Sequence, residues 1–102
     1  MQADNVDLLG LWVTDPEDRT AVSEYGRVSM DFRPDGQLIY TIFEQGKRQV
    51  MLLVYQINGD ILITDQPSSP REERTRFEIR GDTLTLFYAD HQSTYRRRLE
   101  NV

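Results

Sequence analysis

Cysteine is absent from this sequence of 102 residues, and long apolar runs are absent too. Without cysteine the chain can form neither a disulfide framework nor a thiolate metal site. No apolar stretch approaches the roughly 18 residues that a membrane span needs, so we expect a soluble protein. The first twelve residues lack the basic segment and apolar stretch of a secretory signal. We therefore expect a cytoplasmic protein, although an export signal removed earlier would leave the same sequence.

Histidine is nearly absent, because His91 in the turn "ADHQS" is the only one. A single histidine without cysteine cannot form a Cys–His pair, and the scattered serines show no triad spacing. Asp15, Glu17 and Asp18 could hold calcium weakly, but acids at a helix start explain them better. We expect no enzyme, no cofactor and no metal site. The net charge of −5 also argues against nucleic acid as a partner.

Helical periodicity is weak throughout, whereas short β-rich runs separated by turn residues are frequent. Eight strands are predicted, at 8–15, 25–32, 37–43, 48–57, 61–65, 73–79, 83–89 and 93–100. Short connections make neighbouring strands pair antiparallel, and closure of such a meander removes both exposed edges. The sequence predicts one domain over 1–102, an all-β, eight-stranded up-and-down barrel. The alternative is a strongly bent, partly open sheet.

Two short segments are candidates for helix. Segment 15–24 offers Asp15 as the N-cap and Pro16 in the first helical position, and it could cover one end of the barrel. Segment 4–9 could make a single turn before the first strand.

Two copies of one phrase occur, "INGDILIT" at 57–64 and "IRGDTLTL" at 79–86. The second copy contains Arg80-Gly81-Asp82, a tripeptide known for binding cell-surface receptors. Asn58-Gly59 between two β-rich runs is a strong hairpin signal, because the turn needs positive φ. Gly81 occupies the equivalent position, so we interpret both copies as turns, and a three-residue match is weak evidence for receptor binding.

Alternation of side chains sets the two faces of the strands. Around the second repeat, Phe77, Ile79, Leu84, Leu86 and Tyr88 share one face. Transfer of this phase to the other strands predicts an inward set comprising Val28, Met30, Phe32, Leu38, Tyr40, Ile42, Met51, Leu53, Tyr55, Ile57 and Leu62.

The first and last strands carry a further pattern, Gly10-Leu11-Trp12 at the start and Arg97 at the end. A Gly-any-Trp on the first strand, answered by an arginine on the last, resembles the lipocalin and fatty-acid-binding group, the calycins. The resemblance implies that Arg97 packs over Trp12 and closes one end of the barrel, with Gly10 beside them. This chain is much shorter than usual lipocalins, and it looks more like compact lipocalin-like domains of unassigned function.

A small barrel of this kind is only just wide enough to hold one ligand or to be filled by its own side chains. The first function hypothesis is therefore a non-catalytic module that binds a small apolar or amphipathic ligand. The candidate ligand residues inside the barrel are Tyr40, Tyr55, Phe77 and Tyr88.

The predicted outer face carries two unusual groups of side chains. Strands three to five are apolar on both faces, and such a patch is expected to be covered, most simply by a second copy in a homodimer. A partner protein or segment 15–24 could cover it instead, and assembly through the outer faces is the second function hypothesis. The interface candidates are Ile39, Phe43, Val50, Leu52, Val54, Ile61 and Ile63. A basic patch for an acidic partner, or a solvated face with cross-strand ion pairs, comprises Arg74, Arg76, Arg80, Arg96 and Arg98.

Overall fold

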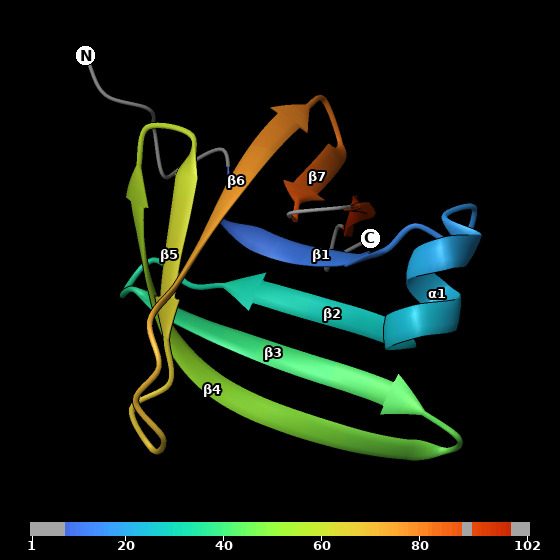
Figure 1. The fold of residues 1–102 in the computed structure, drawn as a ribbon, viewed down its shortest axis with the longest axis horizontal. Coiled ribbons are helices and arrows are strands. Elements are labelled where there is room, and N and C mark those ends of the chain that lie inside the picture. Colours follow the sequence, from blue (N-terminus) through green and yellow to red (C-terminus); the bar gives the residue numbers. More distant parts are fainter. Residues whose placement is uncertain (1–7, 89–90, 99–102) are drawn as a thin grey trace.

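A computed structural model of the chain describes residues 8–88 and 91–98. Eight antiparallel strands in up-and-down order close into a barrel, which confirms the predicted fold class (Figure 1). The strands are β1 (Gly10–Thr14), β2 (Arg27–Phe32), β3 (Gln37–Glu44), β4 (Lys47–Asn58), β5 (Ile61–Asp65), β6 (Glu73–Arg80), β7 (Thr83–Phe87) and β8 (Gln92–Arg98). One helix, α1 (Arg19–Tyr25), lies between β1 and β2.

Strand ends differ from the predicted ones by one or two residues, with β7 as the clearest case. The prediction extended this strand to 89, but β7 ends at Phe87. The amide of Tyr88 donates to the His91 carbonyl over 2.8 Å, so the chain turns toward β8 there. The predicted turn at 4–9 and the final residues 99–100 lie largely outside the described residues.

Helix α1 begins later than predicted, and its N-cap is Asp18, not Asp15. The Asp18 carboxylate accepts from the amides of Ala21 and Thr94, which ties the start of the helix to β8. Asp15 is used differently, because its carboxylate accepts from the Glu17 amide two residues later and so forms a local turn. No helix among the described residues is long and apolar enough to cross a membrane.

Helix α1 packs against β2 and β8 at one end of the barrel, and Ala21 is buried there. Exposed apolar side chains remain on the outer face of β3 and β4. The segment that contains α1 is therefore not the cover that this apolar face was expected to find.

Three hairpin turns share one end of the barrel, and each is tied to the next strand along the chain. The Gly36 carbonyl accepts from the Tyr55 amide, the Asp60 carbonyl from the Phe77 amide, and the Asp82 carbonyl from the Arg97 amide. The two repeated phrases supply the last two of these turns, with φ of +63° at Gly59 and +59° at Gly81. The repeat therefore has a structural role, since its turns join three strands where an ordinary hairpin joins two.

Strand β4 is much longer than the strand that follows it. It has 12 residues, whereas β5 has five. Pairing with β3 covers Lys47 to Val54, but pairing with β5 covers only Val54 to Asn58. The hairpin of β3 and β4 therefore projects beyond β5, as Figure 1 shows, and residues 47–53 are paired along one side only.

Candidate functional site

Trp12 and Arg97 form the centre of a closed end. They lie directly opposite each other in the β1–β8 register, and the Arg97 guanidinium carbon lies 4.3 Å from the Trp12 ring centroid. The Trp12 indole is fully buried and donates to the Leu8 carbonyl over 2.9 Å. Arg97 also donates to the Leu9 carbonyl and pairs with the Asp82 carboxylate, each at 3.3 Å. A cation over an indole is attractive, and the remaining guanidinium donors find oxygen acceptors.

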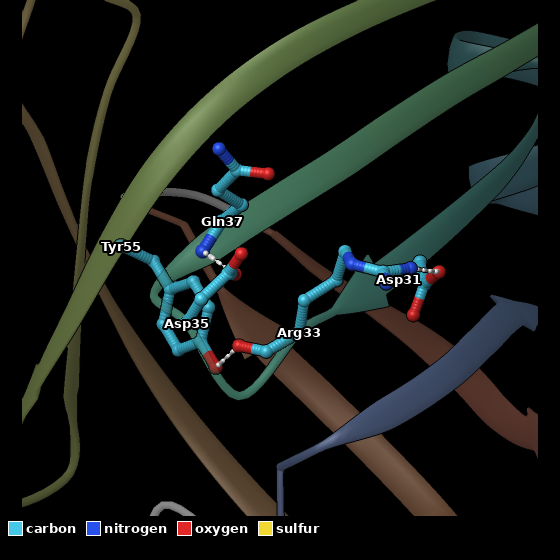
Figure 2. Close-up of polar contacts among 5 residues, drawn as sticks. All are labelled: Asp31, Arg33, Asp35, Gln37 and Tyr55. Atoms are coloured by element: carbon cyan, nitrogen blue, oxygen red, sulfur yellow. Dashed lines mark hydrogen bonds and ion pairs between the residues drawn. The ribbon is translucent and has the colours of Figure 1, made fainter.

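Tyr55 belongs to the same closed end and does not line the cavity described below. Its hydroxyl donates to the Arg33 carbonyl over 2.7 Å (Figure 2). Its ring also meets the Phe32 ring edge to face, with centroids 5.1 Å apart. The turn between β2 and β3 is further fixed by the Asp35 carboxylate, which accepts from the Gln37 amide. Burial raises the pKa of Tyr55, and the nearby charges of Asp35 and Asp31 raise it further.

The closed end around Trp12, Arg97 and Tyr55 forms a plug of the barrel. A cavity of about 350 Å³ lies between this plug and the end that holds the tip of the β3–β4 hairpin. Its walls come mainly from inward side chains of β2 to β7, and its mouth is polar. The apolar and aromatic lining residues are Met30, Leu38, Tyr40, Ile42, Met51, Leu53, Leu62, Leu86 and Tyr88. The polar lining residues are Thr64, Asp65, Gln66, Arg71, Glu73 and Thr75. The arrangement suits one small molecule with an apolar body and a polar end.

Three tyrosines, Tyr40 of β3, Tyr88 just after β7 and Tyr95 of β8, lie near one another. Tyr95 is buried, and burial raises its pKa above the ordinary value of 10, with neighbouring Tyr88 and Tyr40 raising it further. Tyr88 and Tyr40 both line the cavity. Tyr88 is 38% exposed, and its ring lies 4.8 Å from the His91 ring, at the mouth and not deep inside.

Only half of the four predicted ligand residues line the cavity. Tyr40 and Tyr88 do, whereas Tyr55 lies in the buried core and Phe77 packs against it, and neither lines the cavity. All four were selected by strand alternation, which identifies the inward face but not the level along the barrel axis. Met30, Met51 and Thr75 were missed as lining residues for the same reason. Alternation predicted the inward phase of all three residues, but not their level along the barrel axis.

Four of the five arginines of the predicted basic patch have partners close by. Arg74 pairs with Glu72, Arg80 with Glu78, and Arg96 with Asp15. The Arg76 guanidinium carbon lies 4.1 Å from the Phe87 ring centroid. Arg98 is exposed on the same outer face. This pattern favours a solvated face with local ion pairs over a site for an acidic partner.

The predicted interface residues lie on the outer face of β3, β4 and β5, but they differ in exposure. Leu52 is 65% exposed, and Phe43, Val50 and Val54 are also exposed. Ile39, Ile61 and Ile63 are half-buried. Ile39 lies opposite Leu52, while Ile61 and Ile63 lie opposite Arg76 and Arg74. The exposed apolar group is therefore concentrated on β4 and the end of β3.

No group of three histidine, cysteine, aspartate or glutamate side chains that could share a metal ion occurs among residues 8–88 and 91–98. No family model, curated protein or solved structure matches the chain. A function can therefore be inferred only from the geometry and chemistry of the barrel.

The closed end generates a stability prediction. Replacement of Arg97 with Gln should lower the free energy of unfolding by about 2 kcal/mol, because the cation–π contact and a charged hydrogen bond are lost. The ion pair with Asp82 should add little, since that carboxylate is largely exposed. The matched control is Arg98→Gln on the outer face, which should change stability by less than about 0.5 kcal/mol. Urea unfolding followed by Trp12 fluorescence measures both, and equal losses would contradict the assignment of Arg97 to the plug.

The buried Tyr95 should make the free energy of unfolding depend on pH in the alkaline range. Because its pKa is raised in the folded protein, the unfolded chain releases this proton first as the pH exceeds 10. The stabilising contribution is complete below pH 10 and should fall above it, by at most about 1.4 kcal/mol per pH unit for this group. Tyr95→Phe should make the free energy of unfolding fall less steeply between pH 10 and the Tyr95 pKa. Identical slopes in the wild type and the variant would exclude Tyr95 as the titrating group.

Proposed function

We propose that this chain is a compact, lipocalin-like member of the calycin type that holds one small apolar or amphipathic molecule. The cavity of about 350 Å³, open at the end opposite the plug of Trp12 and Arg97, is the observation that carries the proposal. Ligand pockets commonly start at about 300 Å³, so the cavity suits a single small molecule.

The chemistry of the walls indicates which molecule would be held. The lower walls are formed by Leu38, Leu62 and Leu86, which are buried and offer no hydrogen bonds. The mouth carries Asp65 together with an Arg71–Glu73 ion pair of 3.3 Å. A ligand with an apolar body and a polar end would bury the body and leave the polar end at the mouth. Tyrosine hydroxyls near the mouth could bind that polar end.

The role is proposed to be non-catalytic. The described residues that line the cavity include neither cysteine nor histidine, whereas covalent catalysis usually pairs a nucleophile with an adjacent base. His91 lies against Tyr88 at the rim. Binding and release of an unmodified ligand is the activity that this arrangement supports best.

Two neighbouring leucines on β4 provide a matched test of the ligand proposal. Leu53 lines the cavity, whereas Leu52 points outward and is largely exposed. Leu53→Trp should fill part of the cavity and weaken binding of the amphipathic dye anilinonaphthalene sulfonate at least about tenfold. A tenfold loss corresponds to only about 1.4 kcal/mol of binding free energy. Leu52→Trp should leave dye binding unchanged. Titrations followed by dye fluorescence measure both, and equal affinities in the two variants would refute the cavity as the site.

Assembly is the second candidate function, supported by the exposed side chains of Phe43, Val50, Leu52 and Val54. Contiguous apolar surface of this kind marks interaction sites in soluble proteins. A homodimer with a filled core would need no ligand, and the apolar outer face would be its working surface. The arginine face supports assembly less well, because most of its charges have partners within the chain.

The assembly proposal predicts that Leu52→Asp separates a dimer into monomers, because a carboxylate at the centre of the apolar face would be desolvated on association. The matched control is Gln56→Asp, an outward and exposed position further along the same strand. Native mass spectrometry reports subunit number and any retained small molecule in one spectrum. An unchanged particle mass for Leu52→Asp would show that this face is not an interface.

A further inference from the structure

The side of β4 that faces away from β3 is an open sheet edge over residues 47–53. In an antiparallel strand, the N–H and C=O groups of one residue point to the same side, and the side alternates along the chain. The Tyr55 amide bonds to the Gly36 carbonyl, on the β3 side of the strand. The main-chain groups of Val50 and Leu52 therefore point away from β3, beyond the end of the β4–β5 pairing. Among the described residues, no main-chain hydrogen bond joins these two residues to the loop after β5.

This edge carries none of the protection that natural sheet edges usually show. Exposed edges are commonly protected by charged residues, proline, bulges or short strands. The stretch from Gln49 to Val54 contains no charge and no proline, and its register with β3 is unbroken. Another extended peptide backbone presents donors and acceptors at the spacing of this edge, so the natural occupant is an added strand.

The pairing of β4 with β5 limits the length of an added strand. That pairing reaches Val54, so an added strand can lie only beside residues 48–52 and must then leave the sheet. A groove of about 450 Å³ between residues 50–54 and the loop residues Gln66, Pro67 and Ser68 gives the chain room to leave. A strand as long as β4 itself would run into β5. The occupant is therefore a short extended segment.

The charge at the hairpin end of the edge indicates the chemistry of this segment. Lys47 and Arg48 begin β4. Neither has an ion pair or a side-chain hydrogen bond with another described residue, whereas most other arginines have a carboxylate or ring partner. Next along the edge, the side chains of Val50 and Leu52 are apolar and exposed. Apolar residues followed by a carboxylate would complement this order.

We propose that this edge binds an extended segment of a partner protein, which adds a strand antiparallel to β4. The segment residues opposite Leu52 and Val50 would each exchange two main-chain hydrogen bonds with β4. Their side chains would pack on the exposed apolar face, and a carboxylate two residues further on would meet Arg48. Antiparallel pairing is the arrangement of every neighbouring pair in the barrel and is slightly more stable per residue than parallel pairing.

The added strand goes beyond the proposed ligand function but shares a wall with it. Met51 lines the cavity. Residues opposite each other on paired strands place their side chains on the same face, so the segment residue opposite Met51 would point to the cavity side. Main-chain bonds at an edge combined with a pocket for an alternate side chain are a recurring mode of peptide recognition. The two proposals can fail separately, because dye binding tests the cavity and peptide binding tests the edge.

The edge can be tested with a fluorescein-labelled peptide, Gly-Ser-Val-Leu-Val-Thr-Glu-Ser. Its valines would face Leu52 and Val50, its leucine Met51, and its glutamate Arg48. Fluorescence anisotropy should show saturable binding to the wild-type chain. N-methylation of the second valine removes the N–H that donates to Val50 and should raise the Kd at least about tenfold.

N-methylation of the leucine is the matched control, because that N–H points away from β4 and its loss should leave the Kd nearly unchanged. Two outcomes would overturn the proposal. One is the absence of saturation by the unmodified peptide below about 1 mM. The other is equal affinity of the two methylated peptides, which would show that edge hydrogen bonds do not hold the segment.

A charge swap tests the orientation of the segment. Arg48→Glu should raise the Kd of the peptide at least about tenfold, and a lysine in place of the peptide glutamate should restore binding to this variant. Arg98→Glu makes the same change of charge on β8 and should leave the Kd unchanged. Equal effects of the two variants, or no recovery with the lysine peptide, would overturn the proposed antiparallel register.

Amide hydrogen exchange identifies what occupies the edge. The Val50 and Leu52 amides should exchange rapidly in the chain alone and should become protected when the peptide saturates it. Protection without peptide that grows with protein concentration would mean that a second copy holds the edge. Protection at every concentration would mean that the chain covers its own edge. Either result would overturn the proposal, and so would rapid exchange of both amides in the presence of bound peptide.

Discussion

The contact between Arg97 and Trp12 joins the last strand to the first, and the rest of the barrel depends on it. The two residues lie opposite each other where β1 meets β8, so the packing contact and the closing register are the same feature. Arg97 also binds the Leu9 carbonyl and Asp82, which connects the chain before β1 with the turn before β7. Closure at this point determines which end of the barrel is packed, and hence which end keeps the cavity.

The two ends of the barrel are built by different means. At the plugged end, three turns each bond to the next strand, and Tyr55 seals the first turn with a side-chain hydrogen bond. At the other end the chain provides the β3–β4 hairpin, the loop after β5 and the helix α1, which Asp18 ties to β8. Local opening is easiest where few buried contacts and main-chain bonds must break. Because residues 47–53 of β4 are paired along one side only, the mouth is the end at which entry of the proposed ligand needs the least rearrangement.

The unequal lengths of β4 and β5 leave one edge of β4 unpaired beside the cavity. Strand β4 extends beyond the end of β5, so the barrel wall is incomplete beside residues 47–53. This stretch of β4 contributes Met51 and Leu53 to the cavity and exposes Val50 and Leu52 on the outer face. Apolar residues on both faces of a strand are typical of strands that are covered on both sides. The ligand proposal assigns a cover to the inner face, and the assembly candidate assigns one to the outer face.

The sequence by itself determined the number, order and approximate limits of the strands, because alternation and turn residues are local signals. Its resemblance to the calycin pattern pointed to Trp12 and Arg97, which lie on the first and last strands and meet when the meander closes. Tertiary structure alone decided that Tyr40 and Tyr88 line the cavity while Tyr55 and Phe77 do not. It also decided that Asp18 caps α1, and that residues 47–53 of β4 remain unpaired beside β5. The physical reason is common to these cases. Alternation reports the face of a strand, whereas axial level, cap partners and strand overlap are set by pairing between distant residues.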